Sequence, residues 1–237
     1  MLFKRKTSHQ NRKNVIVVNK PGNEVITESF NRLKDNILFF NADNNVKVIQ
    51  ISSSTACEGK TTVLANLAVT MANHGLKILL VEGDLRAPRI HHPFNLDNDN
   101  GIYDYILHNK ELKDIIKHTD SKVDVITRGD KIENPSAVIA SEKYKNLILA
   151  AKEQYDYVLV DCPPVLEISD YIHTSRFSEG TLFCVAYGQT KRHQVKEAIN
   201  LLRKSGINIL GTVYTMVDNK HNNAYTNSRY SNYYYKS

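Results

Sequence analysis

The chain has 237 residues, of which 41% are hydrophobic and 24% are charged, and this ordinary composition excludes a fibrous or wholly disordered protein. No apolar run approaches the roughly 20 residues that a membrane-spanning helix needs, and no apolar segment of a secretory signal follows the basic residues at the start. The three cysteines, Cys57, Cys162 and Cys184, have no Cys-x-x-Cys spacing, which argues against a disulfide scaffold and favours a reducing cytoplasm.

The formal net charge of +6 is concentrated at the ends of the chain. Residues 1–20 contain six lysines and arginines and no acidic residue, whereas residues 21–212 contain 22 basic and 24 acidic residues. We therefore expect no nucleic-acid partner. A basic arm such as residues 1–23 either contacts an acidic surface or is simply solvated.

Hydrophobic periodicity predicts alternating strands and helices. In chain order these are a helix at about 25–40, a strand at 46–51, a helix at about 60–74, strands at 77–81 and 123–126, a helix at about 141–154, strands at 157–160 and 182–186, a helix at about 190–205 and a strand at 209–214. Most of the strands are continuous apolar blocks, which is typical of strands buried on both faces of a parallel sheet. This alternation predicts an α/β fold with a mainly parallel central sheet flanked by helices on both faces.

The sharpest motif follows the first strand. Small residues lead into Gly59-Lys60-Thr61 at the start of a helical pattern, which predicts a phosphate-binding loop and a P-loop NTPase-like fold. The backbone N–H groups of such a loop attract phosphates, while Lys60 is expected to reach the β- and γ-phosphates and the Thr61 hydroxyl to bind Mg²⁺. The expected nucleotide-binding residues are Ser54, Thr55, Ala56, Cys57, Glu58, Gly59, Lys60, Thr61 and Thr62.

Acidic residues follow two later strands. Asp84 lies in the sequence Val-Glu-Gly-Asp-Leu-Arg at 81–86, and Asp161 ends the apolar run at 158–160. In open α/β sheets ligands bind outside the carboxyl ends of the strands, where Mg²⁺ prefers oxygen ligands. A single acid at a strand end is more simply a cap or a turn residue. Three correctly placed segments together favour a metal site formed by Thr61, Asp84 and Asp161.

These motifs together resemble the bacterial tyrosine kinases (BY-kinases) that regulate capsule and exopolysaccharide synthesis, especially the separate kinase subunits of Gram-positive bacteria. The phosphate loop resembles the Walker A motif, residues 81–86 the Walker A′ motif and residues 159–164 the Walker B motif. Further similar stretches are residues 101–106, 134–136, 169–170 and 209–213. The resemblance covers about residues 24–237 and implies a protein-tyrosine kinase that uses ATP and Mg²⁺.

The resemblance also implies catalytic roles for Lys60, Glu82 and Asp84. Lys60 positions the γ-phosphate, Asp84 binds Mg²⁺, and Glu82 takes the proton from the acceptor tyrosine. A phenol has a pKa near ~10, so a nearby base helps its hydroxyl to attack. The family usually has Asp where this chain has Glu82. Because its side chain is one methylene longer, we expect slower chemistry or a changed acceptor preference.

The expected organisation is a basic N-terminal arm (1–23), a P-loop kinase domain (24–217) and a flexible C-terminal tail (218–237). The tail has no aliphatic residue other than one alanine. Its tyrosines, which we expect to be autophosphorylated in trans, are Tyr225, Tyr230, Tyr233, Tyr234 and Tyr235. Five phosphates would add about −8 to −10 charges, which we expect to weaken tail docking and assembly. The alternative is an aromatic tail without a catalytic role.

The resemblance implies assembly and partners as well. A Glu-x-x-Arg-x-x-Arg element mediates ring assembly in the family; here Glu28 matches, Asn31 replaces the first Arg and Lys34 replaces the second. Glu28, Arg32 and Lys34 are therefore the expected oligomerisation residues, and a solvated helix face is the alternative. The implied partner is the cytoplasmic segment of a membrane adaptor, or polysaccharide co-polymerase, which completes the active site. This places the kinase in the cytoplasm, at the inner face of the membrane.

Two other functions stay open at this point. A partition or division-site ATPase would hydrolyse ATP without forming phosphotyrosine, but such ATPases carry a signature lysine where this loop has Thr55. A non-catalytic nucleotide-binding regulator is consistent with Glu82 and with Ala56-Cys57, where the kinase family commonly has Pro-Gly.

Overall fold

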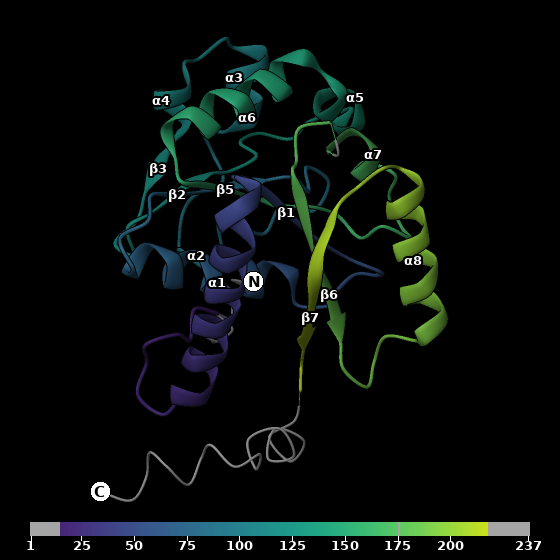
Figure 1. The fold of residues 1–237 in the computed structure, drawn as a ribbon. Coiled ribbons are helices and arrows are strands. Elements are labelled where there is room, and N and C mark those ends of the chain that lie inside the picture. Colours follow the sequence, from purple (N-terminus) through teal and green to yellow (C-terminus); the bar gives the residue numbers. More distant parts are fainter. Residues whose placement is uncertain (1–14, 175, 218–237) are drawn as a thin grey trace, which may run out of the picture.

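The computed structural model describes residues 15–174 and 176–217, and its centre is a twisted β-sheet (Figure 1). In the described residues this sheet has seven strands in the order β3-β4-β2-β5-β1-β6-β7. Neighbouring strands are parallel except for the pair β3 and β4, which confirms the predicted mainly parallel sheet. The strands are β1 (Val48–Ser53), β2 (Ile78–Glu82), β3 (Lys117–His118), β4 (Val123–Ile126), β5 (Tyr157–Asp161), β6 (Gly180–Ala186) and β7 (Ile209–Thr215).

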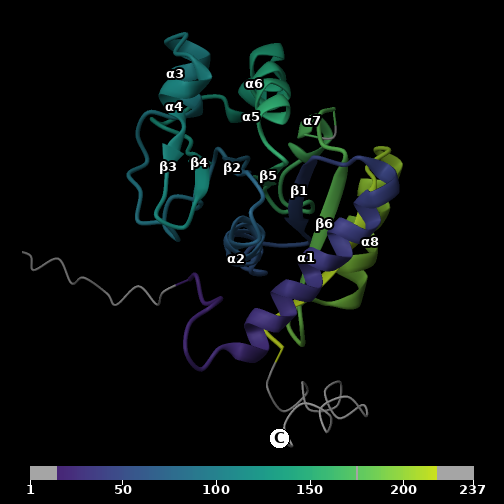
Figure 2. The same ribbon diagram turned by 60° about the vertical axis from the view of Figure 1, so that its left-hand side comes forward.

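Helices cover both faces of the sheet, as predicted (Figure 1). One face carries α1 (Glu24–Asn44) and α2 (Lys60–Asn73). Figure 2 shows α1 beside β6, and residues of α1, β6 and β7 line one small cavity. The other face carries α3 (Ile102–Leu107), α4 (Leu112–Ile115), α5 (Pro135–Ala140), α6 (Glu142–Gln154), α7 (Tyr171–Thr174) and α8 (Arg192–Lys204). Within the described residues, no helix is long and apolar enough to cross a membrane.

Burial on both faces explains the apolar strand sequences. Every residue of β1, β2, β5 and β6 is buried, and alternate side chains of each strand enter the cores on opposite faces. The polar Gln50 is accommodated because its amide donates to the Thr181 hydroxyl at 2.8 Å. Helix α2 lies deep in one layer and is buried from Val63 to Ala72. The phosphate loop therefore connects two rigid elements.

The sequence did not predict β3 or the short helices α3, α4, α5 and α7, which lie between β2 and β6. The pair β3 and β4 and the helices α3, α4, α5 and α7 span only two to six residues each. Such segments are too short to show a hydrophobic period, although β4 was predicted from its apolar residues. The longer elements were predicted, with ends that differ by a few residues.

The strand register brings three loops to one edge of the sheet. Strand β5 lies between β1 and β2, and its last residue, Asp161, pairs with Ile51 of β1 and with Glu82 of β2. The segments that follow β1, β2 and β5 therefore leave the sheet side by side. In this class of sheet, that edge is where ligands bind.

Candidate active site

The segment between β1 and α2 is a tight loop. Cys57 and Gly59 have φ angles of 62° and 82°, in the left-handed region that glycine adopts most easily. A Cβ atom on Gly59 would stand 3.3 Å from the Thr215 side chain, so this glycine also permits a close contact with β7. Helix α2 begins at Lys60, directly after the loop. This strand–loop–helix arrangement is the one predicted for phosphate binding.

Glu58 holds the loop from inside. It is 2% exposed, and its Oε1 accepts hydrogen bonds from the Thr55 N–H at 2.7 Å and from the Thr55 hydroxyl at 2.9 Å. Its Oε2 accepts from the Thr190 hydroxyl at 2.8 Å and from the Ala186 N–H at 3.2 Å. The Thr215 hydroxyl donates to the Glu58 carbonyl at 2.8 Å. Glu58 therefore ties the phosphate loop to the ends of β6 and β7, a role that the motif alone did not reveal.

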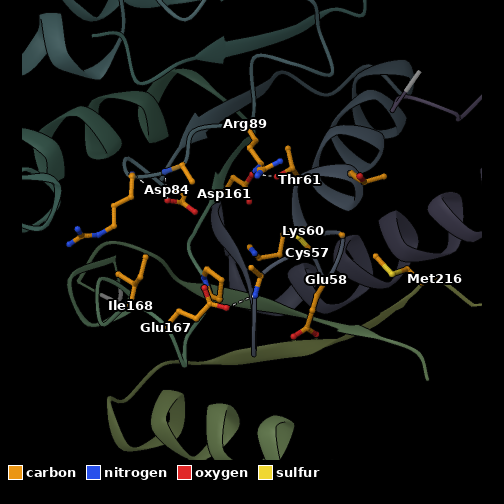
Figure 3. A pocket seen from close by; sticks show the side chains of 16 residues that line it. Cys57, Glu58, Lys60, Thr61, Asp84, Arg89, Asp161, Glu167, Ile168 and Met216 are labelled. Carbon is orange, nitrogen blue, oxygen red and sulfur yellow. Dashed lines mark hydrogen bonds between the residues drawn. The ribbon is translucent and has the colours of Figure 1, made fainter. Parts of the chain in front are cut away.

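The predicted catalytic and metal residues Lys60, Thr61, Asp84 and Asp161 line one cavity of about 370 Å³ (Figure 3). The Lys60 ammonium donates to the Ser53 hydroxyl at 3.2 Å, and the Thr61 hydroxyl donates to Asp161 Oδ2 at 2.6 Å. The cavity thus combines a cation, a hydroxyl and two carboxylates supplied by the segments after β1, β2 and β5. This is the convergence that the strand ends predicted.

Asp161 is the electrostatic centre of the site. Burial, with a smaller contribution from Asp84, raises its pKa to about 6 against the opposing effects of the Thr61 hydroxyl and Lys60. Its Oδ1 is buried and has no hydrogen-bond partner among the described residues. An unpartnered buried carboxylate oxygen next to a threonine hydroxyl and a second carboxylate fits a Mg²⁺ ion, which prefers hard oxygen ligands. Thr61, Asp84 and Asp161 are the residues that would hold it.

Glu82 does not line the cavity. It is completely buried, and its Oε2 accepts from the Arg89 N–H at 2.7 Å and from the Ile90 N–H at 3.1 Å, while its Oε1 accepts from the Asp84 N–H at 3.2 Å. Burial raises its pKa well above the usual range, and the nearby Asp161 adds to this. This geometry favours a positional role, in which Glu82 holds the loop that carries Asp84, over the expected role as acceptor of the tyrosine proton.

The variants Glu82→Gln and Glu82→Ala separate these two roles. If Glu82 positions the loop, the glutamine of Glu82→Gln keeps an oxygen that accepts from the Arg89 and Ile90 N–H groups. This variant should form phosphotyrosine within about tenfold of the wild-type rate, because one neutral hydrogen bond contributes only about 1 kcal/mol. Glu82→Ala leaves buried N–H groups unpaired and should unfold in urea with about 2–4 kcal/mol less stability. If Glu82→Gln is stable and loses all activity, Glu82 is the proton acceptor instead.

A polar cluster also fixes the loop after β2, which carries Asp84. Arg86 donates to the Ser136 hydroxyl at 2.7 Å and pairs with Asp170 Oδ2 at 3.6 Å, and Ser136 donates to Asp170 Oδ1 at 2.5 Å. Asp170 is 2% exposed. The family-like stretches at 134–136 and 169–170 thus meet at Arg86. Sequence spacing gave no signal for this contact, because the three residues come from separate loops and short helices.

The expected oligomerisation residues on α1 differ in burial: Glu28 and Arg32 are exposed, whereas Lys34 is buried. Arg32 Nε pairs with Glu28 Oε1 at 3.1 Å on the exposed face of the helix. Lys34 is only 6% exposed and pairs with Asp35. Its charge is therefore not presented to a partner as expected, because position 34 turns towards the packed side of the helix. The expected phosphorylation sites, residues 225–235, and most of the N-terminal arm lie outside the described residues.

The fold and the cavity together define a P-loop nucleotide-binding protein. Comparison with known proteins agrees, because residues 46–176 match the family model of an AAA domain. The chain is 33% identical to CapB of Staphylococcus aureus over 84% of this chain and 88% of that protein. It is 30% identical to the tyrosine-protein kinase YwqD of Bacillus subtilis (strain 168), over 90% of each chain.

Solved structures give the same assignment. The crystal structure of the chimerical protein CapA2B2 matches with a TM-score of 0.81 at 33% identity, covering 86% of this chain and 90% of that chain. The chain therefore belongs to the bacterial tyrosine-protein kinases, in the branch that includes CapB, YwqD and CpsD, and it is an enzyme of that class.

Proposed function

We propose that this kinase transfers the γ-phosphate of ATP to the tyrosines of its own C-terminal tail, in trans, and that it regulates capsular or exopolysaccharide synthesis and export with a membrane adaptor. The observation that carries the proposal is the cavity in which Lys60, Thr61, Asp84 and Asp161 meet. Its lysine, hydroxyl and carboxylates suit a nucleoside triphosphate with Mg²⁺, and the chain belongs to a family of tyrosine kinases.

Positioning and electrostatics account for most of the chemistry in phosphoryl transfer. Lys60 would neutralise charge on the β- and γ-phosphates, and the loop N–H groups would hold the phosphates in line with the acceptor. Mg²⁺, bound by Thr61, Asp84 and Asp161, would supply charge stabilisation for the transferred group. Glu82 and Arg86 would keep Asp84 in place through the contacts described above.

The residues just before the tail, Thr215 and Met216, lie beside this cavity, which supports the tail as the substrate. Thr215 donates to Glu58 in the phosphate loop, and Met216 lines the cavity. The described part of the chain therefore ends next to the proposed nucleotide site. In an assembly, which Glu28 and Arg32 would help to build, the tail of one subunit would enter the cavity of another. The adaptor segment would complete the site and hold the enzyme at the inner face of the membrane.

A mixing experiment tests transfer in trans. Lys60→Met supplies an inactive chain with all five tail tyrosines, and an active chain carries phenylalanine at positions 225, 230, 233, 234 and 235. Incubated together with ATP and Mg²⁺, the mixture should yield phosphotyrosine on the tail peptides of the Lys60→Met chain, as read by mass spectrometry. ATP hydrolysis without phosphotyrosine on any tail would favour a partition-type ATPase switch. A mixture without phosphotyrosine on the Lys60→Met chain, when the wild type alone phosphorylates its own tail, would exclude transfer in trans.

A further inference from the structure

The segment that follows Asp161 is bonded directly to the phosphate loop. The Val165 N–H donates to the Ser53 carbonyl at 2.9 Å, and the Leu166 N–H donates to the Ser54 carbonyl at 3.1 Å. These backbone bonds continue the β1–β5 pairing beyond the sheet. They fix the position of the next residue, Glu167, relative to the loop.

Glu167 points back at the loop. Its Oε1 accepts a hydrogen bond from the Ala56 N–H at 2.7 Å, although the two residues are 111 positions apart. Glu167 is exposed and lines the cavity. Figure 3 shows its carboxylate on the opposite side of Lys60 from Asp161. An exposed carboxylate therefore lines the same cavity as Lys60, the lysine that is expected to reach the terminal phosphates.

The other carboxylates around the site are each placed for another role. Asp161 accepts from Thr61, and Asp84 Oδ1 accepts from the Ala87 N–H at 3.0 Å, in the positions suited to Mg²⁺. Glu82 and Glu58 are buried and hold loops. Glu167 has neither of these roles and is exposed, and its Oε2 has no hydrogen-bond partner among the described residues, since the Ala56 N–H bonds to Oε1. It can accept a proton from a group that arrives from solvent.

We propose that Glu167 accepts the proton of the acceptor tyrosine, an inference that rests on the proposed tyrosine phosphorylation. As the phenol oxygen bonds to the γ-phosphorus and the bond from that phosphorus to the leaving oxygen of ADP breaks, the phenolic proton passes to the Glu167 carboxylate and then to solvent. The products are ADP, phosphotyrosine and a proton. The Ala56 N–H orients the carboxylate, in the way that a second group orients a general base.

One competing role follows from the same hydrogen bond. The N–H groups of the phosphate loop are expected to bind the phosphates of ATP, and the Glu167 carboxylate already accepts from one of them. In the nucleotide-free enzyme Glu167 would then take the place of a phosphate group. A competitor of this kind weakens ATP binding and has no part in the transfer step. A proton acceptor, in contrast, affects the rate of transfer and leaves ATP affinity nearly unchanged.

The experiment uses the full chain, ATP and Mg²⁺, and a random glutamate–tyrosine copolymer as acceptor, so that it does not depend on the tail. For Glu167→Gln we expect kcat for phosphotyrosine formation to fall about 100-fold, the usual loss for a general base, with an ATP Kd within about twofold of wild type. Glu153→Gln, which replaces an exposed carboxylate of α6 outside the cavity, should match the wild type.

The outcomes separate this inference from the proposed function. An unchanged kcat in Glu167→Gln overturns the inference, and an unchanged kcat with about tenfold tighter ATP binding identifies Glu167 as the competitor of phosphate. A wild-type enzyme that phosphorylates the copolymer and never its own tail overturns the proposed tail phosphorylation, while the comparison of Glu167→Gln with wild type on the copolymer still decides the role of Glu167.

Discussion

Replacing Lys60 by methionine is expected to lower the rate of phosphotyrosine formation about 1,000-fold, because removal of one preorganised electrostatic contact to a developing charge typically costs 10² to 10³ in kcat. The Lys60 ammonium lies 3.2 Å from the Ser53 hydroxyl, inside the cavity that Asp84 and Asp161 also line. Methionine keeps an unbranched stem of similar length and removes the charge. The loss should therefore appear in catalysis and triphosphate affinity and not in folding.

The matched control is Lys196→Met, which removes an exposed lysine from α8, outside the cavity. Incorporation of labelled phosphate from ATP into protein tyrosine measures activity, and urea unfolding measures stability, which should differ by less than about 0.5 kcal/mol between the control and wild type, as for most surface substitutions. If Lys60→Met transfers phosphate at the rate of Lys196→Met, the cavity described here is not the active site.

The parts of the site that local sequence encodes were predictable. A strand, a small-residue loop and Gly59-Lys60-Thr61 occur consecutively, so their geometry follows from backbone preferences within about a dozen residues. The convergence of Asp84 and Asp161 needed only the rule that parallel strands end at the same edge. The register places Asp161 opposite Glu82 at that edge, as the rule requires.

The parts that depend on the direction of a side chain were not predictable. Glu82 and Asp84 are two residues apart in one motif, yet Glu82 turns under its own loop and Asp84 into the cavity. Lys34 was expected at a surface and is buried, because the turn of α1 towards the sheet depends on tertiary packing. Glu167 reaches Ala56 across 111 residues, and Glu58 reaches Thr190 across 132. Contacts over such separations leave no periodic signal in a single sequence.

Asp161→Asn is expected to make the nucleotide-free protein more stable and at the same time inactive. In the folded wild-type protein the pKa of this buried carboxylate is about 6, whereas the ordinary pKa of an aspartate is 3.8. That difference corresponds to about 3 kcal/mol of destabilisation where the group is ionised. Asparagine can still accept from Thr61, but its NH₂ group replaces the unpartnered Oδ1 and gains no acceptor there, which costs about 1 kcal/mol. We therefore expect a net gain of about 2 kcal/mol at pH 8, with kinase activity reduced about 1,000-fold by loss of a metal ligand.

The pH dependence gives this prediction a definite sign. Above pH 6 the carboxylate is ionised in both the folded and the unfolded chain, so the wild type carries the full penalty and the advantage of Asp161→Asn is greatest. As the pH falls below about 6 the folded protein binds a proton before the unfolded chain does, and the penalty shrinks. Because the cost of about 1 kcal/mol from asparagine does not change with pH, the advantage should be gone at about pH 4.5. Urea unfolding of both proteins at pH 8 and pH 4.5 measures this, with Asp130→Asn, an exposed residue, as control. An equal or lower stability of Asp161→Asn at pH 8 would show that the Asp161 carboxylate is not strained in the empty site, and retained kinase activity would show that it is not a metal ligand.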